Sequence, residues 1–488
     1  MINIQAKFMD KKIILAVFLF LLLSTALLKI YFVNGVDWDF AAHYLSAKSA
    51  DSNNFLNVIK EEVISKQTTM QLGIVEKGKI YFESYRAPLS IAFFMVLYPL
   101  LGHNSAIAYL MIMVILLFYA TLYFSKKLGI NYLFTASLFA LPYILIFTFV
   151  VNSEGMLSLI LMIIALSFES DNKWQSGIFI GLAGLAKYTS LIFLPMLLLL
   201  QGRKNILKGY LSFVIVTLPW LVFNYIIFGN PLYSYLSSIS VSLESSAPSP
   251  ISLTAIFTIV AFFIPAIIIS ILLSYWYFKE KKKRAYQAFR KNVFKRPLII
   301  LISFLSLSIV EFIILGRHES PFDQARYAYF LYSALAFLIA YAIDKLISLI
   351  KNDKAYLKKS IIHNSDIILF LFSAATIVGA LVILNTGMHA NLTSGSQNRI
   401  FTDAVSETRE LNMYNCTFVS NDWVYLRYYN ITAYSPYFYN SSIKAFPVIV
   451  INSIGTSSNA VYIGLHKKIY SNDSFSIYLS NSSNEQHC

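Results

Sequence analysis

Two aspartates follow the first long apolar run of the chain and could act together in acid–base chemistry. The run covers residues 13–33, and the segment GVDWDFAAHY places Asp37 and Asp39 just beyond it. A positioned carboxylate can take the proton from a hydroxyl group as that group attacks an electrophile. The same residues also suit a plainer role, because aspartate often caps a helix or lies solvated at its end.

Further polar residues recur where other apolar runs end, and their types suit the binding of a phosphate group. Glu154 lies between two apolar runs, Arg86 lies in SYRAPLS at the start of another, and Lys187 interrupts the apolar stretch 175–200. Lysine and arginine stabilise the charge that develops on a leaving phosphate. The loop RHESPFDQARY adds four more candidates: His318, Asp323, Arg326 and Tyr327.

Each charged residue also has a structural interpretation. A lysine at the membrane centre costs about 2.5 to 3.5 kcal/mol unless it is paired or hydrated. Lys187 could instead extend to the lipid headgroups, and the arginines could anchor the chain at the membrane surface. Glu311, within a later apolar run, could form a hydrogen bond between helices. Both kinds of interpretation stay open at this stage.

The elements that position these residues are expected to be membrane helices. The chain has 488 residues, 57% hydrophobic and only 13% charged, whereas a soluble protein carries about a quarter charged residues. Several apolar runs approach or exceed the ~20 residues that span a bilayer. The net charge is +14, and the basic residues lie largely in the short segments between apolar runs. Cytoplasmic loops of membrane proteins carry such an excess of lysine and arginine. Orientation in the membrane therefore explains the charge, and no nucleic-acid partner is expected.

The apolar runs and the basic segments predict about eleven transmembrane helices, with a cytoplasmic N-terminus and an extracytoplasmic C-terminus. The segment 279–297 is the strongest indication, with nine basic residues and one acidic residue. Residues 34–104 form a large first outer loop that ends in a short apolar helix at 88–101. The stretch 175–200 is predicted to be a hairpin of two short helices that turns near Lys187, and residues 230–252 are predicted to be a polar loop.

The last hundred residues differ in character from the rest. They alternate apolar and polar residues in FPVIVI, AVYIGL and SFSIYL, which is typical of short strands. Glycosylation sequons occur here and support an outer location. They begin at Asn391, Asn415, Asn430, Asn440, Asn472 and Asn481. The cysteines, Cys416 and Cys488, could pair or remain free thiols.

The fold predicted for the chain is therefore an all-α polytopic membrane protein with two parts. Residues 1–385 form the transmembrane part. Residues 386–488 form a small α/β or β-rich extracytoplasmic domain.

Four stretches resemble the GT-C superfamily of membrane glycosyltransferases. They are VDWDFAAHYLSAKS, YRAPLSIAFFMVLYPLLG, GLAGLAKYTSLIFLPMLLL and ARYAYFLYSALAF. The likeness is nearest to the branch that uses dolichyl- or polyprenyl-phosphate sugars, which includes protein mannosyltransferases and aminoarabinose transferases. A tryptophan separates Asp37 from Asp39, whereas the mannosyltransferases usually have an adjacent acidic pair.

The resemblance implies a function and assigns roles to the candidate residues. A sugar such as mannose would pass from a lipid-phosphate carrier to a hydroxyl acceptor at the outer face, with inversion. Asp39 or Asp37 would be the base, and Glu154, Arg86, Lys187, His318, Asp323, Arg326 and Tyr327 would bind substrate. The resemblance assigns no particular cofactor and implies that a metal ion is not universal, although paired carboxylates suit a divalent cation. A transporter of lipid-linked sugars and an inactive scaffold are the alternatives, and a transporter would place ionisable residues near the membrane centre.

Overall fold

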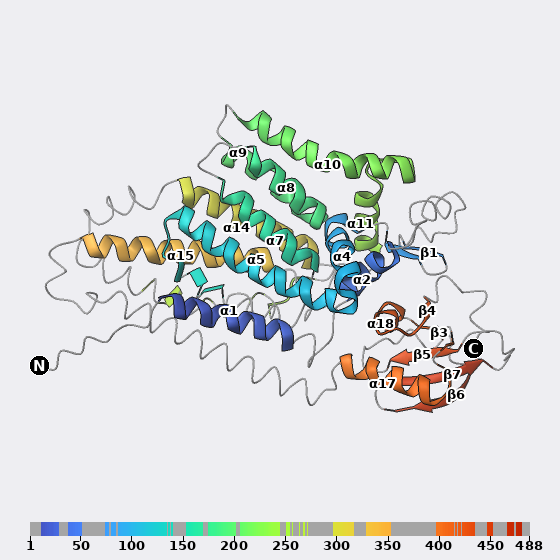
Figure 1. The fold of residues 1–488 in the computed structure, drawn as a ribbon. Helices are drawn as coiled ribbons and strands as arrows, with labels where there is room; N and C mark the ends of the chain where they lie inside the picture. Colours follow the sequence, from blue (N-terminus) through green and yellow to red (C-terminus); the bar gives the residue numbers. More distant parts are fainter. Residues whose placement is uncertain are drawn as a thin grey trace, which may run out of the picture.

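In the computed structural model the described residues are mostly helical, with one short strand pair near residue 80 and a sheet near the C-terminal end (Figure 1). The described residues are 11–28, 38–50, 74–77, 80–83, 86–133, 135–136, 138–139, 153–168, 174–201, 205–244, 250–253, 256, 263, 267–268, 271, 296–316, 328–352, 397–413, 415–416, 418–420, 422–434, 447–451, 466–472 and 475–480.

Residues 11–128 supply α1, α2, a strand pair, α4 and α5. The antiparallel pair of β1 and β2 precedes α4, and the 3-10 helix η2 joins α4 to α5. The bounds are α1 Lys11–Leu28, α2 Trp38–Ala50, β1 Ile74–Lys77, β2 Ile80–Glu83, α4 Pro88–Leu101, η2 Gly102–Asn104 and α5 Ser105–Leu128. The predicted short helix at 88–101 is confirmed. It starts with Pro88 in its first turn, where a missing backbone N–H costs nothing.

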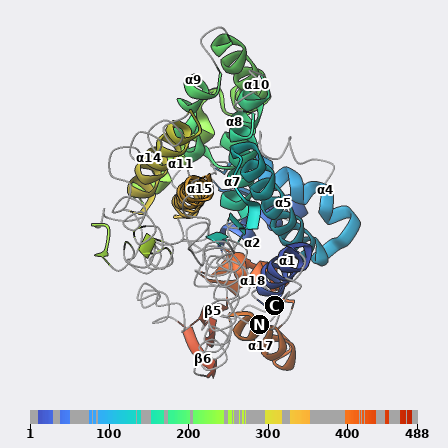
Figure 2. The ribbon, with the colours of Figure 1, turned by 90° about the vertical axis from the view of Figure 1, so that its left-hand side faces the viewer.

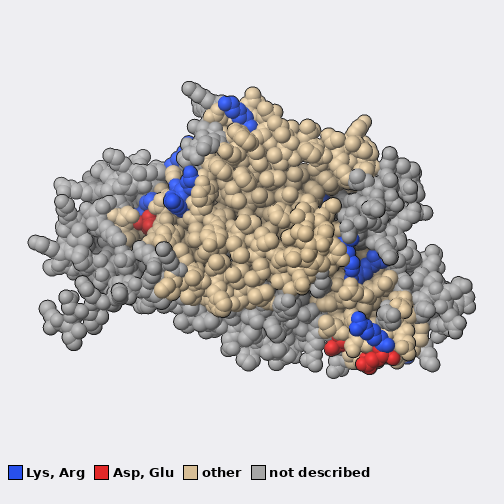
Figure 3. Space-filling model, viewed as in Figure 1, with Lys and Arg blue, Asp and Glu red and all other residues tan. Residues whose placement is uncertain are grey.

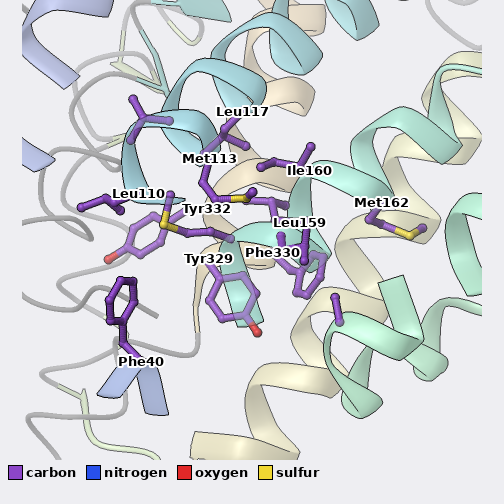
Figure 4. Packing of buried hydrophobic residues seen from close by; sticks show 14 of the residues in the cluster. Phe40, Leu110, Met113, Leu117, Leu159, Ile160, Met162, Tyr329, Phe330 and Tyr332 are labelled. Atoms are coloured by element: carbon purple, nitrogen blue, oxygen red, sulfur yellow. The ribbon is translucent and has the colours of Figure 1, made fainter. Parts of the chain in front are cut away.

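The middle of the chain continues with helices packed side by side. α7 packs against α5 and α8, α8 also packs against α10, and α14 packs against α15. The bounds are α7 Ser153–Leu166, α8 Gln175–Ala186, η3 Tyr188–Phe193, α9 Met196–Leu200, α10 Ile206–Phe228, α11 Tyr233–Glu244, α14 Arg296–Gly316 and α15 Tyr329–Asn352. Figure 4 shows side chains from α5, α7 and α15 meeting in the buried core between these helices.

The helical hairpin predicted at 175–200 is confirmed. α8 ends at Ala186, Lys187 has an extended backbone, and η3 and α9 lead the chain back. Gln201 after α9 donates a hydrogen bond to Ser176 at the start of α8, so the two ends of the hairpin lie side by side. Gly177 allows α10 to approach closely, because a Cβ atom there would lie 2.0 Å from the carbonyl oxygen of Gly209.

One segment differs from its prediction as a polar loop. Within residues 230–252, α11 forms a helix of 12 residues. Its first turn is held by buried Asn224 of α10, whose Oδ1 accepts hydrogen bonds from Ser234 N–H (3.3 Å) and Ser234 Oγ (2.6 Å). Leu232, Leu236 and Ile239 are exposed at helical spacing. The serines concealed this apolar periodicity in the sequence.

Four of the described helices are long and apolar enough to cross a membrane. They are Ser105–Leu128, Ile206–Phe228, Arg296–Leu315 and Tyr329–Ser348. Four more described helices are apolar but shorter. Figure 3 shows an uncharged surface over the middle of these helices, with charged side chains gathered toward the two ends. The chain is therefore a membrane protein. The count of about eleven spans stays a prediction, because the expected spans at 253–278 and 367–385 lie largely outside the described residues.

The C-terminal region contains a five-stranded sheet with strand order β4-β3-β5-β7-β6. β3 pairs in parallel with β4 and β5, whereas β7 is antiparallel to β5 and β6. The elements are α17 Gln397–Glu410, β3 Phe418–Val419, α18 Trp423–Tyr428, β4 Ala433–Tyr434, β5 Val448–Ile451, β6 His466–Ser471 and β7 Phe475–Ser480. Strands were predicted in FPVIVI and SFSIYL and are present there. AVYIGL lies outside the described residues, and the status of this region as a separate domain stays a prediction.

The C-terminal region contacts the helical part through α18 and α2 (Figure 2). The rings of Tyr44 and Tyr428 lie 5.1 Å apart, edge to face. Lys48 Nζ donates a hydrogen bond to Asn430 Oδ1 over 3.3 Å. Burial lowers the pKa of Lys48, and the nearby charge of Arg427 lowers it further. The helix that begins with the Asp39 segment is thus in direct contact with the C-terminal region.

Candidate active site

The predicted residues Arg86, Glu154 and Lys187 lie in one buried region: Arg86 pairs with Glu154, and Tyr329, the partner of Lys187, packs against Gly155 beside Glu154. They come from three separate segments, namely the turn before α4, the first turn of α7 and the turn of the α8–α9 hairpin. Arg86 is 7% exposed, Lys187 is 6% exposed and the side chain of Glu154 is 12% exposed. Charged groups so far from water require charged or hydrogen-bonding neighbours, and the structure supplies them.

Glu154 is the centre of one half of the cluster. Its Oε1 lies 2.9 Å from His43 Nε2 of α2 and 3.5 Å from Arg86 Nη1, which donates a hydrogen bond to it. His43 is fully buried. One carboxylate oxygen therefore connects α2, α7 and the segment that enters α4.

Lys187 is the centre of the other half. Its Nζ donates a hydrogen bond to the hydroxyl of Tyr329 at the start of α15, and also lies 4.7 Å from the centre of that ring. Figure 4 shows the Tyr329 ring among the buried side chains of α5, α7 and α15. The extended backbone of Lys187 separates α8 from η3.

The two halves touch at Gly155. A Cβ atom on this residue would lie 2.8 Å from the ring of Tyr329, so only glycine allows the ring to pack there. Gly155 follows Glu154 directly in α7. Tyr329, which pairs with Lys187, therefore packs against Gly155, and Gly155 is the direct neighbour of Glu154, which pairs with Arg86.

Two linked hydrogen bonds hold the backbone at Arg86 in place. Tyr188 donates its hydroxyl to the carbonyl oxygen of Arg86 over 3.0 Å, and Trp220 Nε1 donates to the same hydroxyl over 2.9 Å. The ring of Tyr235 on α11 packs 4.2 Å from that of Tyr188. The helix that was predicted to be a loop thus supports the position of Arg86.

Glu311 of α14 is another buried acid near Lys187. Thr189 Oγ1 donates a hydrogen bond to its Oε1 over 3.2 Å, and both Lys187 and Tyr329 interact with it. The hydrogen-bonding role between helices that the sequence allowed for Glu311 agrees with this geometry. It joins α14 to the hairpin that carries Lys187.

The other predicted site residues are only partly covered by the structure. Asp39 lies in the first turn of α2, one turn before His43, and only its backbone is described. Five predicted site residues lie outside the described residues: Asp37, His318, Asp323, Arg326 and Tyr327. Their roles stay predictions.

The sequence interpretation overlooked His43, Tyr188 and Tyr329. A signal for His43 was available, because residues 39 and 43 are one helical turn apart. Tyr329 follows the predicted Arg326–Tyr327 pair by two positions, so the ARYAYF segment indicated the right part of the chain. Nothing in the local sequence distinguishes Tyr188 from other aromatic residues.

No group of three or more His, Cys, Asp or Glu side chains among the described residues could hold a metal ion. The paired carboxylates for which a divalent cation was considered are Asp37 and Asp39, whose side chains are not described.

Some of the predicted sequons and cysteines lie among the described residues, and the others lie outside them. Asn415, Asn430 and Asn472 are exposed. Asn391, Asn440 and Asn481 lie outside the described residues. Cys416 is buried and disulfide-bonded, and the second cysteine of the chain, Cys488, lies outside the described residues.

Comparison of the chain with protein-family models, curated proteins and solved structures gives no match. The class that the fold and composition define is a polytopic, mostly helical membrane protein with a buried cluster of charged residues.

Proposed function

We propose that the chain is a membrane glycosyltransferase that uses a lipid-linked donor. It would move a sugar, with mannose as one candidate, from a polyprenyl- or dolichyl-phosphate carrier to a hydroxyl acceptor. The observation that carries the proposal is the burial of Arg86, Glu154 and Lys187, from three distant segments, in one region beside α2, whose first turn contains Asp39. Two buried cations in the same region suit a phosphate group, and a membrane setting suits its lipid chain.

The chemistry assigned to these residues is an inverting substitution at the anomeric carbon. The acceptor oxygen forms a bond to that carbon, and the bond from the carbon to the carrier phosphate breaks. Asp39, or Asp37, takes the proton of the acceptor hydroxyl. Arg86 and Lys187 stabilise the carrier phosphate as it leaves with the bonding electrons, and Arg326 is assigned the same task.

The charge distribution supports a location at the outer membrane face. α5 ends in Lys126 and Lys127, whereas its first residue, Ser105, adjoins α4 through η2. Basic residues collect on the cytoplasmic side of membrane proteins. The N-terminal end of α4, which follows Arg86, and the C-terminal region lie toward the opposite end of the molecule from these lysines (Figure 1). We therefore assign the site and the C-terminus to the outer side.

The proposal is tested by sugar transfer in proteoliposomes that contain the purified protein and radiolabelled polyprenyl-phosphate mannose. Wild-type turnover that collapses in Asp39→Asn, with donor binding retained, is the expected result. Turnover that survives in Asp39→Asn would move the role of base to Asp37 or Glu154. Movement of the lipid between leaflets without sugar transfer, for every polyprenyl-phosphate sugar tried, would replace the enzyme by the transporter.

A further inference from the structure

The strongest unassigned feature of the cluster is His43, a fully buried residue of α2 that faces a buried carboxylate. Its Nε2 lies 2.9 Å from Glu154 Oε1. The contact has the distance of an ion pair but not the angle of a hydrogen bond. His43 therefore acts on Glu154 as a polar neighbour in close contact with its carboxylate.

Glu154 connects this histidine to Arg86. The same oxygen, Oε1, accepts the hydrogen bond from Arg86 Nη1. A carboxylate held from two sides has less rotational freedom than one held from a single side. The direction in which Glu154 holds the Arg86 guanidinium therefore depends on His43.

We propose that His43 is a positioning residue of the transfer site, acting through Glu154 on Arg86. Because His43 is fully buried, it does not need to touch the substrate for this role. The inference rests on the proposed function, since its effect would be seen on the lipid-phosphate donor that Arg86 is assigned to bind. It also ties α2 to α7, and the backbone of residue 39 lies one turn earlier on α2.

Glutamine and asparagine distinguish the two ring nitrogens of the histidine. The side-chain amide nitrogen of glutamine can take the position of the histidine Nε2 atom. The shorter side chain of asparagine places its amide nitrogen near the position of Nδ1. His43→Gln should keep transfer within about threefold of wild type. His43→Asn and His43→Leu should raise the donor KM by about tenfold or more, because a buried carboxylate loses a polar neighbour.

Ser46→Ala provides a matched control on the same helix. Ser46 is also fully buried and polar, but its hydroxyl bonds only to the carbonyl oxygen of Ala42 within α2. Its donor KM should stay at the wild-type value. A purely structural role of position 43 would instead make glutamine and asparagine equally harmful and would not separate donor KM from kcat.

A double-mutant cycle with Glu154→Gln tests the route of the effect. If His43 acts through Glu154, the donor KM of His43→Leu combined with Glu154→Gln should be close to that of Glu154→Gln alone. Independent, multiplying effects would overturn the proposal, as would equal behaviour of the glutamine and asparagine variants. A wild type that neither binds polyprenyl phosphate nor transfers sugar overturns the proposed function, and the role of His43 with it. Normal wild-type transfer with no response to any His43 variant overturns the role of His43 alone.

Discussion

Two buried carboxyl groups, Glu154 in the helical part and Asp422 in the C-terminal region, have opposite surroundings. Glu154 faces His43 and Arg86. Asp422 is 5% exposed, and its Oδ2 has no hydrogen-bond partner among the described residues. Burial raises the pKa of Asp422 to about 6.

The contrast shows two ways in which a protein accommodates a buried acid. Partners of opposite charge can offset the loss of hydration, or the acid can take up a proton more readily. Charged partners keep the carboxylate ionised, so that it can act on neighbouring groups. An acid without such partners lowers the stability of its own region at neutral pH, where it must lose its proton. The helical cluster therefore has the arrangement expected of a working site, and Asp422 does not.

The largest effect is expected from removing the shared carboxylate. Glu154→Leu leaves Arg86 and His43 buried without that acid, and losing one member of a buried ion pair costs about 3 to 5 kcal/mol. The melting temperature in detergent should fall clearly, and sugar transfer should disappear. Adding Arg86→Met and His43→Leu should recover part of the stability but no activity. A single variant as stable as wild type would contradict the pairing.

Lys187→Met tests the other half of the cluster through activity. The variant keeps the length of the side chain and removes the charge assigned to the leaving phosphate. Loss of one such group costs about 100-fold to 1,000-fold in kcat, which radiolabelled sugar transfer would measure. Lys345→Met is the control, because Lys345 lies near the opposite end of α15 and pairs with Asp344. Equal losses in both variants would remove Lys187 from the site.

Asp422→Asn should stabilise the protein at neutral pH. The pKa rises from 3.8 in the unfolded chain to about 6 in the fold, and at about 1.4 kcal/mol per unit this amounts to at most about 3 kcal/mol. The folded state prefers the protonated acid, so this penalty is absent below pH 3.8, grows as the pH rises to about 6, and is complete above it.

The measurement is thermal unfolding of wild type and Asp422→Asn at pH 4.5 and pH 7.5. The variant should gain more at the higher pH. Asp403→Asn, on the exposed face of α17, serves as the control and should change little. An equal gain at both pH values would show that Asp422 is not the titrating group.

Gly155→Ala should have the smallest effect of the four. Its methyl group would meet the Tyr329 ring at 2.8 Å, so the ring must move away from its position beside Lys187. Overpacking of this kind costs about 1 to 3 kcal/mol. Gly102→Ala is a useful contrast, since its Cβ would meet nothing within 4 Å and its cost comes from a positive φ of 54°. Transfer should fall in the first variant and persist in the second.

The sequence by itself determined the membrane class and most helix positions. Apolar runs bounded by proline, glycine and basic residues predicted α4, α10 and the hairpin at Lys187, because hydropathy and chain breakers act locally. Alternating patterns likewise predicted β5 and β7. The candidate residues Arg86, Glu154 and Lys187 could also be chosen from their types, since a charge next to an apolar run is conspicuous.

Only the tertiary structure decided which of these residues meet. His43 and Glu154 come from different helices, and Lys187 and Tyr329 are 142 positions apart, so no local pattern could pair them. The contact of α18 with α2 likewise joins distant segments, and α11 is held by Asn224 of the preceding helix, ten positions before Ser234. The physical reason is that hydropathy determines where a helix forms, whereas packing against its neighbours determines how it is rotated and which side chains it brings together.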